Sequence, residues 1–187
     1  MTYVREQGYP APAVGDAGDG YLVMERLDGP TMLEDLLARP RRLRGDARVL
    51  AGLHRRLHEI AALPHLPPVD VEGDRLLHRD LHPLNVLMTA RGPVVIDWAN
   101  CARGGAAYDV ADAWVLFATA DVPGGRRDRA LAAIGRRIFL RQFLGELDVE
   151  AARVAIPAVV RHRLEDRHMS DAEKVRMRRM AARAART

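Results

Sequence analysis

Cysteine and long apolar runs are nearly missing from this sequence of 187 residues, and each absence excludes a class of protein. Cys101 is the only cysteine, which rules out an intrachain disulfide and a cysteine-rich zinc site. No apolar run approaches the roughly 18 residues that a membrane-spanning helix needs. The first ten residues have neither the basic nor the apolar segment of a secretory signal. We therefore predict a cytoplasmic protein with no membrane partner.

Lysine is also scarce. Lys174 is the only one, so arginine supplies nearly all of the positive charge, and the formal net charge is +4. Residues 174–187 carry six basic side chains and no acidic one. Segments that bind single-stranded nucleic acid combine basic with aromatic side chains, and this segment has no aromatic residue. We predict a solvated final helix there and no nucleic-acid partner.

The first part of the chain is predicted to form strands and turns. Pro10 and Pro12 exclude a helix interior at that point. A strand is expected to begin at 13–14, the glycine- and aspartate-rich residues 15–20 suit a turn, and 21–24 form an apolar run typical of a strand. Together these segments predict a β-hairpin.

Helical patterns follow this hairpin. Thr31 and Glu34 have the spacing of a capping box, which predicts a helix that stops near Pro40. Asp46 can cap a longer helix over residues 47–63, whose apolar residues recur at spacings of three and four.

A second hairpin and a helical half complete the predicted fold. Short strands are expected near 86–88 and 94–96, joined by a turn at 91–93. From Tyr108 the pattern is helical to the end of the chain, with a break near 123–125. The chain is therefore predicted to be α+β, with helices over most of its length.

The segment His-Arg-Asp-Leu-His-Pro-Leu-Asn at 78–85 carries the most chemistry, and Ile-Asp-Trp follows it at 96–98. The first segment fits the H-R-D-L-x-x-x-N pattern of phosphoryl-transfer enzymes. Asn85 and Asp97 flank the predicted hairpin, so their side chains can converge at one end of it. Amide and carboxylate oxygens are suitable ligands for Mg²⁺. Asp80 stands where a substrate hydroxyl could donate its proton.

The histidines of the chain are predicted to support structure more than chemistry. His78 is expected to organise the loop by hydrogen bonding, and His82 either orients the loop or contacts phosphate or substrate. His54 and His58 lie one helical turn apart, but they lack the glutamate of an H-E-x-x-H zinc motif. We therefore predict an ordinary half-buried helix there.

These motifs resemble the aminoglycoside phosphotransferase and choline kinase-like family, which has a protein-kinase-like fold. That family shows H-x-D-x-H-P-x-N and then I-D-W, and both patterns stand here at 78–85 and 96–98. Residues 8–12 resemble the entry to the last strands of the family's N-terminal lobe. Residues 23–29 resemble the linker between its lobes, and 105–111 resemble its G-x-x-x-D-x-A segment.

The resemblance implies a fold and an activity. Residues 1–27 would be a remnant of the N-terminal lobe, with its last strands and the hinge, and 28–187 would form the mainly helical C-terminal lobe. The implied reaction is transfer of the γ-phosphoryl group of ATP, or of another nucleoside triphosphate, to a hydroxyl of a small molecule. Mg²⁺ would be the metal.

The resemblance also implies roles for the residues named above. Asp80 would be the catalytic base, and Asn85 and Asp97 would hold the metal. Asp109 would brace the catalytic loop.

The nucleotide would contact the backbone around the linker residues Met24, Glu25 and Leu27. Kinases of this kind cover ATP with a glycine-rich loop, a strand lysine and a helix glutamate. This sequence has none of the three before the linker, and Lys174 lies near its other end. We expect the natural start to lie upstream of Met1, so that this chain alone has weak or no kinase activity. A naturally shortened relative, or a second chain that supplies the strands, are the alternatives.

Two other functions stay open. One is a non-catalytic nucleotide-binding or regulatory protein built on the same lobe. The other is a metal-dependent hydrolase that uses His78, Asp80, His82 and Asp97 as ligands. The sequence selects neither an oligomeric state nor one substrate among aminoglycosides, choline, sugars, macrolides and other alcohols.

A cationic substrate would need acidic partners in the C-terminal helices. The candidates are Asp112, Asp121, Glu146, Asp148, Glu165 and Asp166.

Overall fold

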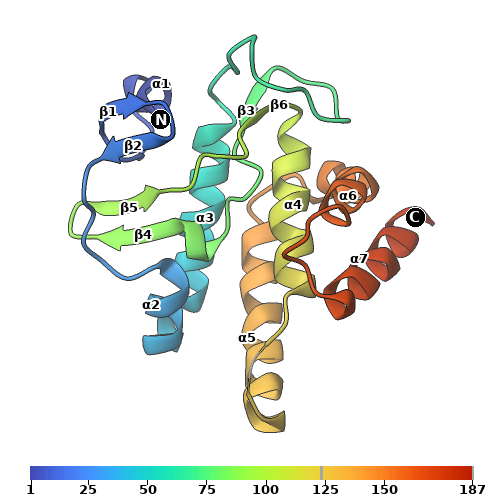
Figure 1. Ribbon diagram of the computed structural model, residues 1–187. Coiled ribbons are helices and arrows are strands. Elements are labelled where there is room, and N and C mark those ends of the chain that lie inside the picture. The colour runs from blue at the N-terminus through green and yellow to red at the C-terminus, as the bar shows by residue number, and fades with distance from the viewer. Residues whose placement is uncertain (123, 187) are drawn as a thin grey trace.

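The computed structural model describes residues 1–122 and 124–186 (Figure 1). Pro123, in a predicted break between helices, and Thr187, at the end of the basic tail, lie outside the described residues. The helices are α1 (Thr2–Glu6), α2 (Met32–Ala38), α3 (Leu43–Leu57), α4 (Ala106–Thr119), α5 (Arg126–Leu144), α6 (Val149–Arg163) and α7 (Asp171–Ala184), with 3-10 turns η1 (Pro40–Arg42) and η2 (Pro83–Asn85).

In the described part of the chain, six short strands form three separate antiparallel pairs. They are β1 (Val14–Gly18) with β2 (Tyr21–Met24), β3 (Arg75–Leu77) with β6 (Ala102–Gly104), and β4 (Val86–Thr89) with β5 (Gly92–Val95). The predicted α+β class is confirmed, and so are both predicted hairpins. The turn that we placed at 91–93 is shorter than expected, because Gly92 and Pro93 already belong to β5.

The expectation of strands and turns over the first residues is wrong at 2–6. This segment forms helix α1, whose Val4 is buried in the core. Tyr9 follows it into the interior and donates a hydrogen bond to the carbonyl oxygen of Leu53 at 3.2 Å. Packing against α3 therefore decides the conformation of this short segment, since a helix of one turn has little stability of its own.

Helix α2 begins as predicted. The Thr31 side chain accepts a hydrogen bond from the Glu34 amide at 3.2 Å, and the Glu34 carboxylate accepts one from the Thr31 amide at 2.7 Å. This reciprocal pair satisfies amides that a helix start leaves without partners. The helix ends at Ala38, just before Pro40.

Helix α3 differs from its predicted bounds at both ends. It begins at Leu43, so Asp46 is a buried residue of the first turn and not the N-cap. It ends at Leu57 because the chain then turns to pair with β3, where the Leu76 amide donates to the Ile60 carbonyl at 3.0 Å. The predicted apolar face is otherwise correct, and Leu50, Leu53 and Leu57 are buried.

The helices of the second half pack around α4 (Figure 1). Helix α4 contacts α5, α6 and α7, and α3 packs along α5. Phe139 and Phe143 of α5 and Ile156 and Val159 of α6 are almost fully buried between them. Each such side chain contributes about 1.5–3 kcal/mol through burial. None of the described helices is long and apolar enough to span a bilayer.

Candidate active site

The segment 78–80 is fixed to α4 by one carboxylate. Asp109 is almost fully buried, and its two oxygens accept hydrogen bonds from the backbone amides of His78 at 3.0 Å and Arg79 at 2.6 Å. The His58 ring adds a third contact at 3.2 Å. Burial opposes the charge on Asp109, but these contacts outweigh it and hold the pKa of Asp109 below its ordinary value. The buried Asp109 carboxylate therefore holds the backbone of this loop in place through hydrogen bonds.

Two residues of this region have unusual backbone conformations. Arg79 and Asp97 are the non-glycine residues with positive φ in the described part of the chain, and each has a φ of 61°. Such conformations cost on the order of 1–3 kcal/mol each and are concentrated at functional sites. The predicted catalytic loop and the predicted metal ligand thus coincide with the observed strain.

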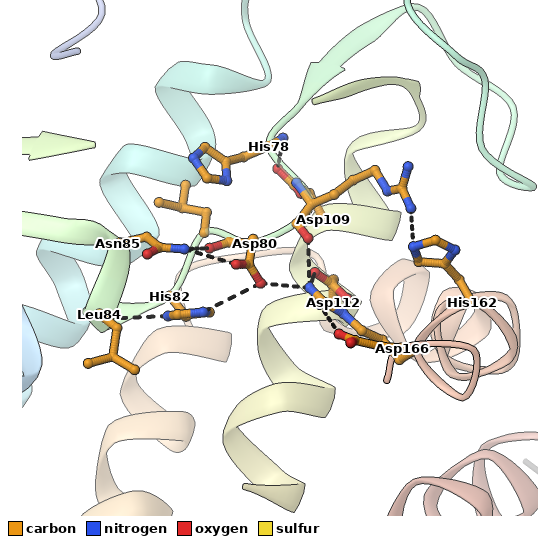
Figure 2. Close-up of polar contacts among 12 residues, drawn as sticks. His78, Asp80, His82, Leu84, Asn85, Asp109, Asp112, His162 and Asp166 are labelled. Carbon is orange, nitrogen blue, oxygen red and sulfur yellow. Dashed lines mark hydrogen bonds and ion pairs between the residues drawn. The ribbon is translucent and has the colours of Figure 1, made fainter. Parts of the chain in front are cut away.

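Asp80 lies at the centre of the polar network in Figure 2. Its Oδ2 accepts a hydrogen bond from Asn85 Nδ2 at 3.0 Å, and the same amide nitrogen donates to the Asp80 carbonyl at 2.9 Å. Its Oδ1 lies 2.8 Å from an Arg163 Nη2 and 3.4 Å from His82 Nε2. Burial opposes the charge, but His82 and Arg163 hold the pKa of Asp80 below its ordinary value. Asp80 is therefore an oriented, ionised carboxylate.

Arg163 is the main residue of this site that sequence reasoning missed. Its Nε and Nη2 donate to the two oxygens of buried Asp112 at 2.7 and 2.6 Å, and its Nη2 also donates to the Arg79 carbonyl at 2.7 Å. Burial alone would lower the pKa of Arg163, but Asp112 and Asp80 outweigh it and raise that pKa. A signal was present, because Arg163 continues the buried helix face that includes Ile156 and Val159. An arginine on such a face needs buried anionic partners.

Asn85 and Asp97 lie at the same end of the β4–β5 hairpin. The Ile96 amide donates to the Asn85 carbonyl at 3.0 Å, which places Asp97 one residue beyond this pair. Because Asn85 uses its amide nitrogen on Asp80, its Oδ1 remains available as an acceptor. The Asp97 side chain is exposed and makes no hydrogen bond or ion pair within the described residues. Two uncommitted oxygen donors therefore flank one end of the hairpin, a donor set that suits Mg²⁺.

His78 and His82 occupy different environments. The His78 ring is fully buried, 4.7 Å from the Trp98 ring, and its Nε2 lies 3.0 Å from the Ile96 carbonyl oxygen. Burial lowers the pKa of His78, so the ring is neutral. The His82 Nδ1 accepts from the Leu84 amide at 3.3 Å while Nε2 faces Asp80. His78 thus ties the loop to the β5 end, and His82 links Asp80 to turn η2.

The other histidine pair also supports the loop. His54 is fully buried with its Nε2 3.1 Å from the Leu81 carbonyl oxygen, and His58 contacts Asp109. Among residues 1–122 and 124–186, these three side chains form the only group of histidine, cysteine or acidic residues with three ligand atoms within 4.8 Å of one another. The ligand set expected for a hydrolase, with His78, Asp80, His82 and Asp97, is therefore not assembled.

The predicted nucleotide linker runs without regular structure from β2 to α2. The Glu25 amide donates to the Ala13 carbonyl at 2.8 Å, and the Glu25 carboxylate pairs with Arg91 beside the β4–β5 turn. Met24 is about half exposed and Leu27 is partly exposed. The contact of this backbone with adenine stays a prediction.

Part of the chain matches a known protein family. A model of the phosphotransferase enzyme family matches residues 58–147, which hold the catalytic-loop motif, the β4–β5 hairpin and α4. The matched segment is slightly less than half of the chain. The resemblance that we predicted from the motifs is therefore confirmed. No curated protein matches the chain.

One solved phosphotransferase structure resembles nearly the whole chain in fold. An aminoglycoside-3'-phosphotransferase of type VIII aligns with a TM-score of 0.53 and 20% identity, over 98% of this chain and 77% of that one. An amicoumacin kinase, solved in complex with AMP-PNP and Ca²⁺, aligns with a TM-score of 0.48 and 13% identity, over 98% of this chain and 74% of that one. At this identity the first alignment establishes the fold alone.

Proposed function

We propose that this protein is a cytoplasmic small-molecule phosphotransferase that moves the γ-phosphoryl group of ATP, or of another nucleoside triphosphate, to a substrate hydroxyl. The observation that carries the proposal is the placement of Asp80 between Asn85 and Arg163, with Asn85 and Asp97 at the same end of the β4–β5 hairpin. Phosphoryl transfer needs positioning and charge stabilisation more than covalent chemistry, and this arrangement supports both.

Asp80 would accept the proton of the attacking hydroxyl. The carboxylate is ionised at neutral pH because Arg163 and His82 lower its pKa. A carboxylate of low pKa is a weak base, so its main contribution would be to orient the hydroxyl toward the phosphorus atom. Arg163 and Asn85 fix the carboxylate from two sides, which limits its rotation.

Asn85 and Asp97 would hold the divalent metal through Oδ1 and the carboxylate. When bound, Mg²⁺ would neutralise the charge on the phosphate oxygens. The strained backbone of Asp97 would aim its carboxylate away from the packed hairpin, since its neighbour Trp98 turns inward and donates its indole N–H to the Val95 carbonyl at 3.0 Å.

We propose further that this 187-residue chain transfers phosphoryl groups slowly by itself. Its single lysine, Lys174, lies on α7, which Figure 1 shows on the opposite side of α4 from the β1–β2 hairpin. No lysine ammonium can then reach a nucleotide beside the linker. This feature also favours a second candidate, a nucleotide-binding protein without turnover.

A phosphotransfer assay with γ-labelled ATP and a panel of small alcohols tests the proposal. Asp80→Asn is expected to reduce single-turnover transfer at least 100-fold, while Asp74→Asn, which removes an exposed carboxylate paired with Arg75, should leave it within twofold. Equal transfer by Asp80→Asn and the wild type would refute the mechanism. If the protein binds Mg²⁺ and AMP-PNP but transfers no phosphoryl group from ATP to any alcohol, the second candidate, a nucleotide-binding protein without turnover, would be established instead.

A further inference from the structure

Two consecutive residues of α6 contact two consecutive residues of the catalytic loop. Arg163 pairs with Asp80, and the preceding residue, His162, accepts a hydrogen bond at Nε2 from an Nη2 of Arg79. Figure 2 shows Asn85 and His162 on opposite sides of Asp80. The proposed metal ligand therefore lies on one side of the base, and the Arg79–His162 pair lies on the other side.

Arg79 has no anionic partner among the described residues, unlike its neighbours. Arg163 lies within 4.0 Å of three carboxylates, and Arg161 pairs with Asp70 at 2.7 Å. The Arg79 guanidinium instead stacks over the Tyr108 ring, 5.9 Å from its centroid, and its Nε is buried without a hydrogen-bond partner. The group is thus oriented but not neutralised.

His162 does not neutralise Arg79 either. The ring is exposed on the surface of α6, and its pKa is lowered by partial burial of the titrating group and by the charges of Arg79 and Arg163. A neutral imidazole that accepts a hydrogen bond from a guanidinium leaves the positive charge intact. Arg79 is partly buried. A guanidinium held in place in this way is well suited to bind a carboxylate or phosphate group through paired hydrogen bonds.

The acidic side chains that could receive a cationic substrate are mostly committed elsewhere. Asp112 is paired with Arg163, Asp121 with Arg176, and Glu146 with Arg48 and Arg55. Asp148 caps α6 by accepting from the Ala151 amide, and Asp166 accepts from the His168 amide. Glu165 alone has no such contact among the described residues. Of these six carboxylates, Glu165 is therefore the one that the described residues leave uncommitted to a cation or a backbone amide.

We propose that Arg79, supported by His162, binds an oxyanion of the acceptor substrate, so that the preferred substrate is a hydroxyl compound that carries a carboxylate or phosphate group. The proposal rests on the proposed phosphotransferase function. Arg79 and Asp80 are consecutive residues, so their Cα atoms are about 3.8 Å apart. An acceptor substrate would contact Asp80 with its hydroxyl and Arg79 with its oxyanion.

Binding of small ions to the full chain, without nucleotide or Mg²⁺, tests the anion site. Inorganic phosphate, malonate and kanamycin are titrated separately, and chemical-shift changes in NMR spectra are followed. We expect saturable binding of phosphate, of malonate or of both, which identifies the preferred oxyanion, and no saturable binding of kanamycin. Saturable binding of kanamycin with neither oxyanion, or no saturable oxyanion binding, would overturn the proposal.

Three variants test whether Arg79 is the residue that binds the oxyanion. Arg79→Gln should weaken oxyanion binding at least tenfold, and Arg161→Gln, which removes a nearby cation already paired with Asp70, should change it less than twofold. His162→Glu places a carboxylate beside Arg79 at an exposed helix position that tolerates substitution, and it should abolish binding. Unchanged oxyanion binding in Arg79→Gln or in His162→Glu would overturn the assignment.

A charge-matched acceptor series separates this inference from the proposed function. Gluconate, glucitol and glucamine have the same carbon chain and differ in charge, and phosphoryl transfer to each is measured with γ-labelled ATP. Preferred transfer to gluconate, lost in Arg79→Gln, supports the inference. Preferred transfer to glucitol or glucamine overturns the inference and leaves the phosphotransferase intact. Oxyanion binding that depends on Arg79, with no transfer to any acceptor, supports the anion site and counts against the phosphotransferase.

Discussion

Arg163 joins the proposed catalytic base to the helical core, because a single Nη2 lies 2.8 Å from Asp80 Oδ1 and 2.6 Å from Asp112 Oδ2. The contact connects the last turn of α6 with the proposed catalytic loop and with α4. Charged groups that are removed from water must compensate one another, so each of the three side chains depends on the other two. The site and the fold therefore share this arginine.

Removal of the arginine should destabilise the protein. Arg163→Met leaves Asp112 buried without its partner, and we expect the free energy of unfolding in urea to fall by about 3–5 kcal/mol. Arg161→Gln is the matched control, because its exposed pair with Asp70 contributes at most about 1 kcal/mol. The double variant Arg163→Met with Asp112→Leu should recover much of the loss. An equal decrease in the free energy of unfolding in Arg163→Met and Arg161→Gln would contradict the role of Arg163 as the buried partner of Asp112.

Substitution of Asp97 should increase the stability of the protein but remove its binding of metal and nucleotide. Its φ of 61° is unfavourable for a residue with a Cβ, so Asp97→Gly is expected to raise the free energy of unfolding by about 0.5–1 kcal/mol. The same change removes a proposed metal ligand and should abolish the stabilisation that Mn²⁺ with AMP-PNP gives in thermal unfolding. Asp74→Asn serves as the control for loss of an exposed carboxylate. Nucleotide-dependent stabilisation that survives in Asp97→Gly would contradict the role of Asp97.

The acid side of the stability profile should depend on buried histidines. Burial lowers the pKa of His54 from 6.5 to about 3, so between these values the unfolded chain binds a proton that the folded chain does not. Stability then falls as the pH decreases from about 6.5 towards 3, by up to about 1.4 kcal/mol per pH unit for this group. His54→Leu should flatten this slope by about one proton, whereas exposed His65→Asn should not. Equal slopes in all three proteins would contradict the prediction.

Asp109 should contribute to the pH dependence of stability at lower pH than His54 does. Its pKa is held below the ordinary value, so its stabilisation is complete above about pH 4 and is lost as the pH falls towards the lowered pKa. Asp109→Asn retains the shape but loses the charge-assisted hydrogen bonds from the His78 and Arg79 amides. We expect it to lower stability at pH 7 by about 2–4 kcal/mol and to reduce the difference between pH 7 and pH 3. An unaltered pH profile would contradict this role.

Local features of the fold were predictable from the sequence, while contacts between distant segments were not. The capping box at Thr31 and Glu34 and both hairpins depend on residues within a few positions of one another. The β3–β6 pair was missed because each strand has three residues and the partners lie far apart in the chain. Helix α1 was missed for a similar reason, since burial of Val4 against distant residues stabilises it.

The candidate site shows the same division. The motif placed Asp80, Asn85 and Asp97 in one region of the chain, and the hairpin between Asn85 and Asp97 explains why they lie at one end of it. Arg163 is 83 residues from Asp80, and no motif connects them. The apolar spacing around Arg163 was visible, but the identity of its partners required the packing of α6 against α4. The contact between Asp80 and Arg163 thus depends on tertiary structure.

The position of a bound metal tests the proposed site most directly. Crystals of the full chain grown with Mn²⁺ and AMP-PNP would locate the ion by its anomalous scattering. We expect an anomalous peak within coordination distance of Asn85 Oδ1 and of the Asp97 carboxylate, with the γ-phosphate directed towards Asp80. A peak at the His54–His58–Asp109 group instead, with no ion between Asn85 and Asp97, would contradict it.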